Sequence, residues 1–181
     1  MTPKDVLEKV TEYTKEHIAP LLLMRKEPKP TGDVMDMTED IPEYVNPAVT
    51  YGTMPHKNFQ PLDFQVPLIL WTFDEVDDNG ETFEGRTVNL RAYVGAYSGE
   101  IYETHDGTET KLPDNKAFVD LINALEKMYI ELCRKHVING VGLKKPINYG
   151  VYDGAYYPYA YGWLTVTAEI GRMDFDDDIE L

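Results

Sequence analysis

The sequence predicts an α+β fold, in which a four-stranded, mostly antiparallel sheet has helices packed on one face and is joined to a long extended arm. Two segments, 86–97 and 162–170, alternate apolar and polar residues with the period of a half-buried strand. A third segment, 114–136, repeats apolar residues with the period of a helix. The elements follow the order helix, arm, two strands, helix, two strands, which favours antiparallel strands with the helices segregated to one side.

The 181 residues have the usual length of a single domain. The 17 Lys and Arg residues against 32 Asp and Glu residues give a net charge of −15, which argues against binding to nucleic acid phosphates or to an anionic membrane. The single cysteine, Cys133, excludes a disulfide within the chain and a cysteine-based zinc site. We expect neither a signal peptide nor a transmembrane helix, because the apolar runs are short.

We divide the domain into an N-terminal helix (1–19), an extended arm or loop (25–65), the sheet with the main helix (66–170) and an acidic tail (171–181). Thr2, Pro3 and Asp5 place a cap, a first-turn proline and a third-position carboxylate at the start of the first helix. The arm holds six prolines, and a loop of this length is usually functional or disordered. Within the arm we expect a short strand at Ala48–Tyr51, with the rest forming an extended arm or a loop that lies on a neighbour.

A hairpin follows the arm. Segment 66–76 is apolar and rich in β-formers, and Asn79-Gly80 tolerates the positive φ of a tight turn. The alternation in the next strand places one set of residues on the core and another set outward. The inward set is Val88, Leu90, Ala92, Val94 and Ala96, and the outward set is Thr87, Asn89, Arg91, Tyr93 and Tyr97.

Segment 99–113 is predicted to be a polar loop, after which Asp114 caps the main helix and Asn139-Gly140 ends it. The apolar stripe of this helix is Phe118, Leu121, Ile122, Leu125, Met128 or Tyr129, Leu132 and Cys133. Its opposite, polar face is Asp120, Glu126, Lys127, Glu131 and Lys135. Strands at 147–153 and 162–170 complete the predicted sheet.

We predict no catalytic, cofactor-binding or metal-binding residue. The four histidines show no paired spacing, so a metal site would need distant residues and stays an open alternative. Ser98 lies in a GxxSG sequence and not in the GxSxG of a nucleophile elbow, which favours a strand end followed by a turn. Cys133 lies on the apolar stripe, where a buried, inert thiol is expected. The acidic residues around 74–84 cluster at a hairpin, where charge keeps the turn solvated.

Segment 149–163 is unusual because it holds six tyrosines and one tryptophan. Such rings combine a large contact area with a polar tip and are enriched at protein interfaces. Two other interpretations stay open, namely a strand connection packed on the edge of its own sheet and a surface that stacks on sugars. The predicted interface residues are Tyr156, Tyr157, Tyr159, Tyr161 and Trp163.

The order of three motifs resembles that of the tail terminator family of tailed bacteriophages, also described as tail completion or head–tail joining proteins. The motifs are PLILW at 67–71, TVNLRAYVGAYS at 87–98 after the acidic hairpin, and YYPYAYGWL at 156–164. The helix at 114–137 lies where that family has its main helix. The resemblance extends over roughly residues 48–170.

This resemblance implies a structural virion protein and not an enzyme. Such proteins form a homo-oligomeric ring, usually a hexamer, that caps the tail tube, ends its polymerisation and joins it to the head connector. The implied partners are other copies of the chain, the tail tube protein and a connector or stopper protein, with no cofactor and no membrane. The implied location is the tail–neck junction of a virion assembled in the host bacterial cytoplasm. DNA would pass through the lumen without specific binding, and an acidic lumen would repel its phosphates.

Three alternatives stay open. The chain would equally suit another connector protein of the head–tail neck, which shares size and ring symmetry. It would also suit the terminator of a contractile tail or of a phage-tail-like bacteriocin. A small intracellular hydrolase that uses the acidic hairpin is a different class, and it predicts a concave pocket with converging titratable groups.

Overall fold

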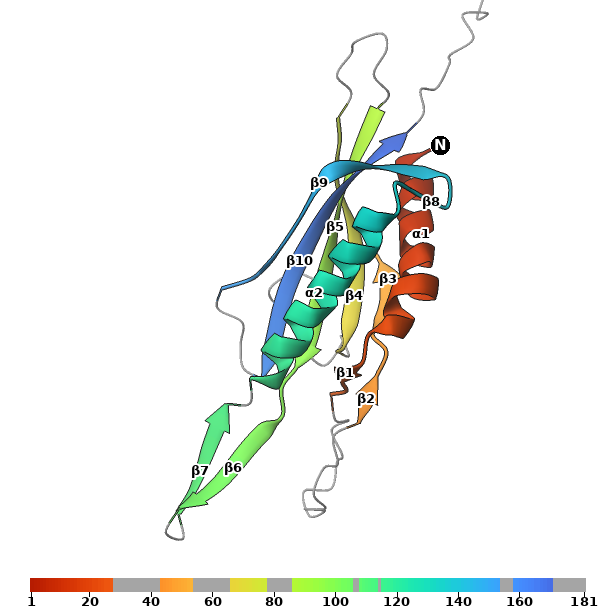
Figure 1. The fold of residues 1–181 in the computed structure, drawn as a ribbon. Helices are drawn as coiled ribbons and strands as arrows, with labels where there is room; N and C mark the ends of the chain where they lie inside the picture. The colour runs from red at the N-terminus through yellow and green to blue at the C-terminus, as the bar shows by residue number, and fades with distance from the viewer. Residues whose placement is uncertain are drawn as a thin grey trace, which may run out of the picture.

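A computed structural model describes residues 1–27, 43–53, 66–77, 86–105, 108–113, 115–153 and 158–170. A six-stranded mixed sheet forms its centre, and the helices α1 (Pro3–Tyr13) and α2 (Lys116–Arg134) lie on one face of this sheet (Figure 1). Across the sheet the strands are β3 (Ala48–Tyr51), β4 (Leu68–Asp77), β5 (Arg86–Tyr97), β10 (Tyr159–Ile170), β9 (Val141–Val151) and β8 (Val137–Ile138).

The prediction of a four-stranded sheet is therefore wrong. The expected strand at Ala48–Tyr51 is present as β3, but it joins the sheet by pairing parallel to β4. A second additional strand, β8, has only two residues and pairs antiparallel with the start of β9. Segments this short carry no readable alternation, so hydrophobic periodicity alone gives no sign that they belong to the sheet.

Two further two-stranded sheets lie outside the central one. The strands β1 (Met24–Arg25) and β2 (Tyr44–Val45) pair with each other, β1 at the start of the predicted arm and β2 within it. The strands β6 (Glu100–His105) and β7 (Thr108–Pro113) form a hairpin where a polar loop was predicted, and Figure 1 shows it projecting beyond the N-terminal end of α2. Its residues are mostly polar, so the segment lacks the apolar face by which strands are recognised in a sequence.

The two central strands confirm the alternation read from the sequence. Strands β5 and β10 pair antiparallel over their full length, from Arg86 opposite Ile170 to Tyr97 opposite Tyr159. Their inward residues are buried against the helices: Val88, Leu90, Ala92, Val94 and Ala96 on β5, and Leu164, Val166, Ala168 and Ile170 on β10. Helix α2 comes so close that a Cβ at Gly162 would lie 2.7 Å from Cδ1 of Leu125.

The first helix starts with the predicted capping box. The Thr2 side chain accepts a hydrogen bond from the Asp5 backbone N–H at 3.2 Å, and the Asp5 carboxylate accepts one from the Thr2 N–H at 2.7 Å. After Tyr13 the chain continues through a π-helical turn (Thr14–Ile18) and a 3-10 turn (Ala19–Leu21). The buried Trp71 indole donates to the Thr14 hydroxyl at 3.0 Å, which ties this segment to β4.

The buried face of α2 is rotated from the predicted stripe. Leu121, Leu125, Met128 and Leu132 are buried as expected, together with the small residues Ala117 and Ala124. Phe118 and Ile122 are instead 48% and 40% exposed. Asp120, predicted on the polar face, is buried and pairs with Lys116, and Cys133 is only partly buried.

Helix α2 ends at Arg134, before the predicted stop at Asn139-Gly140. These two residues have φ values of 47° and 79° and instead connect β8 to β9. Positive φ at both central positions is typical of a two-residue hairpin turn, so the Asn-Gly pair marks a hairpin and not the end of the helix.

Candidate functional site

The face of the sheet opposite the helices carries a cluster of aromatic side chains. Tyr159, Tyr161 and Trp163 occupy alternate positions of β10, so all three point to this outer face. Tyr93 and Tyr97 have the same orientation on β5, and Tyr152 follows the end of β9. We define the aromatic face as Tyr93, Tyr97, Tyr152, Tyr159, Tyr161 and Trp163.

The rings of the aromatic face contact one another in pairs. Tyr93 and Tyr152 stack with centroids 6.1 Å apart, and Tyr159 and Tyr161 stack with centroids 6.3 Å apart. Tyr97 and Tyr159 meet edge to face at 5.8 Å. Five of the six side chains are half-buried, and Tyr152 is 37% exposed. The rings therefore support each other and still present surface to a partner.

Two glycines make room for the largest rings. A Cβ at Gly95 would lie 3.1 Å from Cε1 of Tyr161, and a Cβ at Gly150 would lie 3.0 Å from Cζ2 of Trp163. In the strand register Tyr161 is opposite Gly95, and Trp163 is opposite Gly150. Each ring thus lies across a neighbouring strand at a position without a side chain, which holds it close to the sheet.

Charged groups from the segment around β1 frame one end of the aromatic face. The Tyr159 hydroxyl donates a hydrogen bond to the Glu27 carboxylate. Burial raises the pKa of Tyr159 above its usual value, and the bond to Glu27 raises it further. Burial together with Glu27 also raises the pKa of Tyr161. The Arg25 guanidinium lies 5.9 Å from the centre of the Tyr97 ring, within the range of a cation–π contact.

The other half of the outer face is polar and acidic. Its ion pairs and hydrogen bonds are Arg91 to Asp74 at 2.9 Å, Asn89 to Glu75 at 3.1 Å, Thr167 to Asn89 at 2.7 Å and Lys144 to Glu169 at 3.3 Å. These contacts link β4, β5, β10 and β9 in a row across the sheet. The outer face therefore divides into an aromatic half and a polar half.

Three of the five predicted interface residues come together in this surface: Tyr159, Tyr161 and Trp163. Tyr156 and Tyr157 lie outside the described residues. Tyr149, from the same tyrosine-rich segment, lies on the helix side, where its ring is 5.4 Å from that of Tyr129.

The predicted set did not include Tyr93, Tyr97 and Tyr152, although Tyr93 and Tyr97 were expected on the outward side of their strand. Only the pairing of β5 with β10 brings them beside the C-terminal tyrosines. The sequence does contain one sign of this surface: Gly95 and Gly150 are glycines within strands, and they lie opposite the large rings of Tyr161 and Trp163.

The two candidate nucleophiles of the sequence, Ser98 and Cys133, each contact a neighbouring group of the fold. Ser98 is buried, and its hydroxyl accepts a hydrogen bond from the Ala117 N–H at 3.1 Å, so it caps α2. This agrees with the strand-end interpretation of its sequence. The expected cap, Asp114, lies outside the described residues. The partly buried Cys133 lies beside Tyr129, and a hydrogen bond with its thiol raises the pKa of Tyr129.

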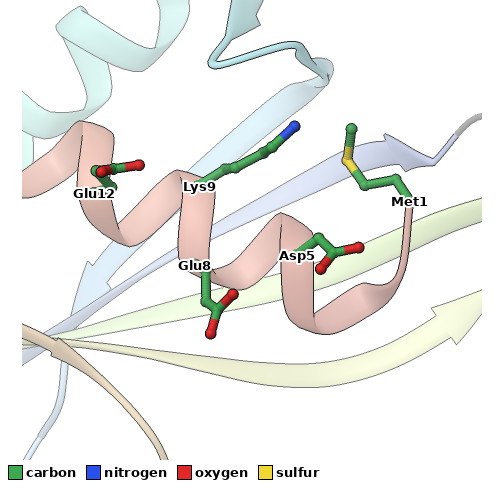
Figure 2. Close-up of a pocket in the computed structure, with 5 residues that line it drawn as sticks. All are labelled: Met1, Asp5, Glu8, Lys9 and Glu12. Carbon is green, nitrogen blue, oxygen red and sulfur yellow. The ribbon is translucent and has the colours of Figure 1, made fainter.

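A surface hollow lies along α1 and is lined by Met1, Asp5, Glu8, Lys9 and Glu12 (Figure 2). In Figure 2 these side chains leave the helix in different directions and do not converge on one point. Two of its carboxylates already have partners, because Asp5 belongs to the capping box and Glu8 accepts a hydrogen bond from the Tyr51 hydroxyl at 2.9 Å. The hollow therefore does not resemble a catalytic centre.

Among the residues that the structure describes, no group of three or more His, Cys, Asp or Glu side chains is placed to hold a metal ion. Within the same ranges, no helix has the length and apolar character needed to cross a membrane. The chain matches no protein-family model and no curated protein.

Proposed function

We propose that this protein is a structural subunit that assembles into a ring, caps a phage tail tube, ends its polymerisation and joins it to the head connector. The observation that carries the proposal is the aromatic face, held on a rigid two-strand ladder at the centre of the sheet. The resemblance of residues 48–170 to tail terminators indicates that the assembly is a ring on a tail tube.

The aromatic face has the properties of a protein-binding surface. Its rings are large, and they are positioned by their contacts with one another. Side chains that are already ordered lose little conformational entropy when a partner covers them. Truncating a central aromatic residue of an interface commonly costs about 2 kcal/mol or more of binding free energy. We assign this surface to contact with the tail tube protein.

The charge of the chain fits a ring through which DNA passes. A ring multiplies the net charge of −15 by the number of its copies. Acidic residues that face a lumen repel phosphate and prevent DNA from adhering during passage.

The test is tail assembly in vitro with the cognate tube protein. We expect tubes polymerised in the presence of the wild-type chain to end in a ring and to stop growing, as measured by length in negative-stain images. Trp163→Ala should fold, as judged by thermal unfolding, and fail to cap. Thr165→Ala, two residues further along the same face of β10, is the matched control and should cap normally.

Two results would contradict the proposal. One is a wild-type chain that never associates with tube ends. The other is a Trp163→Ala variant that folds and caps as well as the wild type, because the aromatic face would then be neither core nor interface.

A further inference from the structure

At each of the two edges of the central sheet, part of a long strand has no partner strand among the described residues. Strand β8 pairs with Val141 and Gly142, and the Leu143 N–H donates to the His136 carbonyl at 2.8 Å, so β9 has no described partner on that side from residue 144 to 151. Strand β3 pairs with β4 only from Leu68 to Trp71, which leaves the outer side of 72–77 without a described partner strand. The backbone N–H and C=O groups along such edges are available to a further strand.

The two edges carry opposite charges. Lys144 and Lys145 lie on the free part of β9, which we call the basic edge. Asp74, Glu75 and Asp77 lie on the free part of β4, which we call the acidic edge. Each of these three carboxylate residues is exposed, and so is Lys145. Opposite charges on the two sides of one sheet favour contact between unlike edges.

The register places these charges at the same height. Lys144 is opposite Thr167, Thr167 is opposite Asn89, and Asn89 is opposite Glu75, so one row crosses the whole sheet. A second copy in the same orientation, placed beside the first, would bring Glu75 next to Lys144. Three successive antiparallel pairings separate β4 from β9, so these strands run in opposite directions and would meet as an antiparallel pair.

Contacts between like edges are disfavoured. Two basic edges would bring lysines together, and two acidic edges would bring carboxylates together. Lysine and proline on an edge strand, as in Lys145-Pro146, commonly guard against unwanted pairing. Here the lysines repel another basic edge but attract an acidic one, while Pro146 costs the new ladder one N–H donor.

Exposed apolar residues lie beside both edges on the helix side. On the side of β9, Tyr149 is exposed beside Tyr129 of α2, and Phe118 and Ile122 of the same helix are also exposed. Phe73 of β4 and Tyr51 of β3 flank the acidic edge. Strand pairing between two copies would cover both groups, and burial of this apolar surface would add to the backbone hydrogen bonds.

We propose that the basic edge of one copy pairs with the acidic edge of the next, so that the sheets continue from subunit to subunit. The inference rests on the proposed ring and names the surface at which its copies meet. A head-to-tail contact between two different edges repeats around an axis and closes into a ring when the rotation permits. The aromatic face takes no part in this contact and stays available to the tail tube.

Charge reversal tests the pairing on the full chain. Lys144→Glu/Lys145→Glu makes both edges acidic, and Glu75→Lys/Asp77→Lys makes both edges basic. Each variant alone should self-associate at least about tenfold more weakly than the wild type in sedimentation experiments at low salt. An equimolar mixture of the two should restore assembly, because every contact then joins unlike edges. Restoration also shows that both variants are folded. The control Lys15→Glu/Lys127→Glu should associate like the wild type.

Cysteine cross-linking gives a test that does not depend on charge. In a Cys133→Ser background, Lys144→Cys and Glu75→Cys are placed on separate copies, mixed and oxidised. Facing positions on antiparallel strands have Cβ atoms about 4.5–5.5 Å apart, so the pairing predicts a disulfide-linked heterodimer. Neither variant alone should form a disulfide-linked dimer to the same extent.

Three outcomes overturn the inference: a wild-type chain that stays monomeric at the highest concentration reached, reversal variants that assemble as well as the wild type, or a mixture that fails to assemble. The proposed function is judged separately by tube capping. A chain that caps tubes while its reversal variants still form rings would keep the function and lose the edge pairing. A chain that pairs by its edges but never caps tubes would keep the edge pairing and lose the proposed function.

Discussion

The Ser98 hydroxyl accepts a hydrogen bond from the backbone N–H of Ala117 at 3.1 Å, and both residues are buried. The first N–H groups of a helix have no partner within the helix, so each needs one from elsewhere. Asn115, at the N-cap of α2, provides no side-chain hydrogen bond. Ser98, directly after β5, therefore caps the first turn of α2 at a residue 19 positions away, and this contact joins the sheet to the helix layer.

Ser98→Ala should lower the free energy of unfolding by about 1–2 kcal/mol, because it leaves the buried Ala117 N–H without an acceptor. Urea unfolding followed by circular dichroism measures the change. Asn115→Ala is the control and should be nearly neutral, since its side chain makes no capping bond. Equal losses from the two variants would contradict capping by Ser98.

Leu125→Ala should cost about 2–5 kcal/mol of stability, because it opens a cavity where α2 packs closely on the sheet at Gly162. The matched control is Ile122→Ala on the same helix, where the side chain is exposed and the loss should be under about 1 kcal/mol. Thermal or chemical unfolding of both variants compares them. A larger loss at Ile122 would mean that the buried face of α2 is assigned wrongly.

Gly95→Ala should destabilise the protein by about 1–3 kcal/mol, because the new Cβ would lie 2.9 Å from Cγ1 of Val66 and 3.1 Å from the Tyr161 ring. Displacement of Tyr161 should also weaken tube capping. Gly52→Ala is the control, since the nearest atom to its added Cβ is 4.0 Å away, and its stability should not fall appreciably. A neutral Gly95→Ala would show that the aromatic face is loosely packed.

Alkaline pH should destabilise the protein through Tyr159. Burial and the bond to Glu27 raise the pKa of Tyr159 above its usual value of 10.0, so the folded state binds its proton more tightly than the unfolded state. The associated stability is fully present below pH 10 and is lost as the pH rises toward the folded pKa.

Tyr159→Phe removes this titrating group, so its free energy of unfolding should fall less steeply above pH 10 than that of the wild type. Urea unfolding between neutral pH and pH 11 checks the difference in slope. Identical slopes would show that Tyr159 does not couple folding to proton binding.

Local patterns in the sequence determined several parts of this protein. The alternation in Arg86–Tyr97 correctly placed Val88 inward and Tyr93 outward, because a strand with one buried face must repeat every two residues. The capping box of Thr2 and Asp5 was also predicted, since its partners are three residues apart and need no tertiary contact. The direction of Trp163 follows from the same two-residue period, whereas Tyr159 and Tyr161 precede the predicted strand at 162–170 and share that direction because β10 begins at Tyr159.

Contacts between distant segments decided the rest. The rotation of α2, which buries Ala117 and exposes Phe118, depends on where β5, β9 and β10 leave room for a helix, and α2's own sequence does not contain this information. The aromatic face exists as one surface only because the β5–β10 register brings Tyr97 beside Tyr159. The short strands β3 and β8 form because the longer strands β4 and β9 provide hydrogen-bond partners for their backbones. Backbone hydrogen bonds do not depend on the order of apolar and polar side chains, so the sequence pattern does not indicate that these two strands join the sheet.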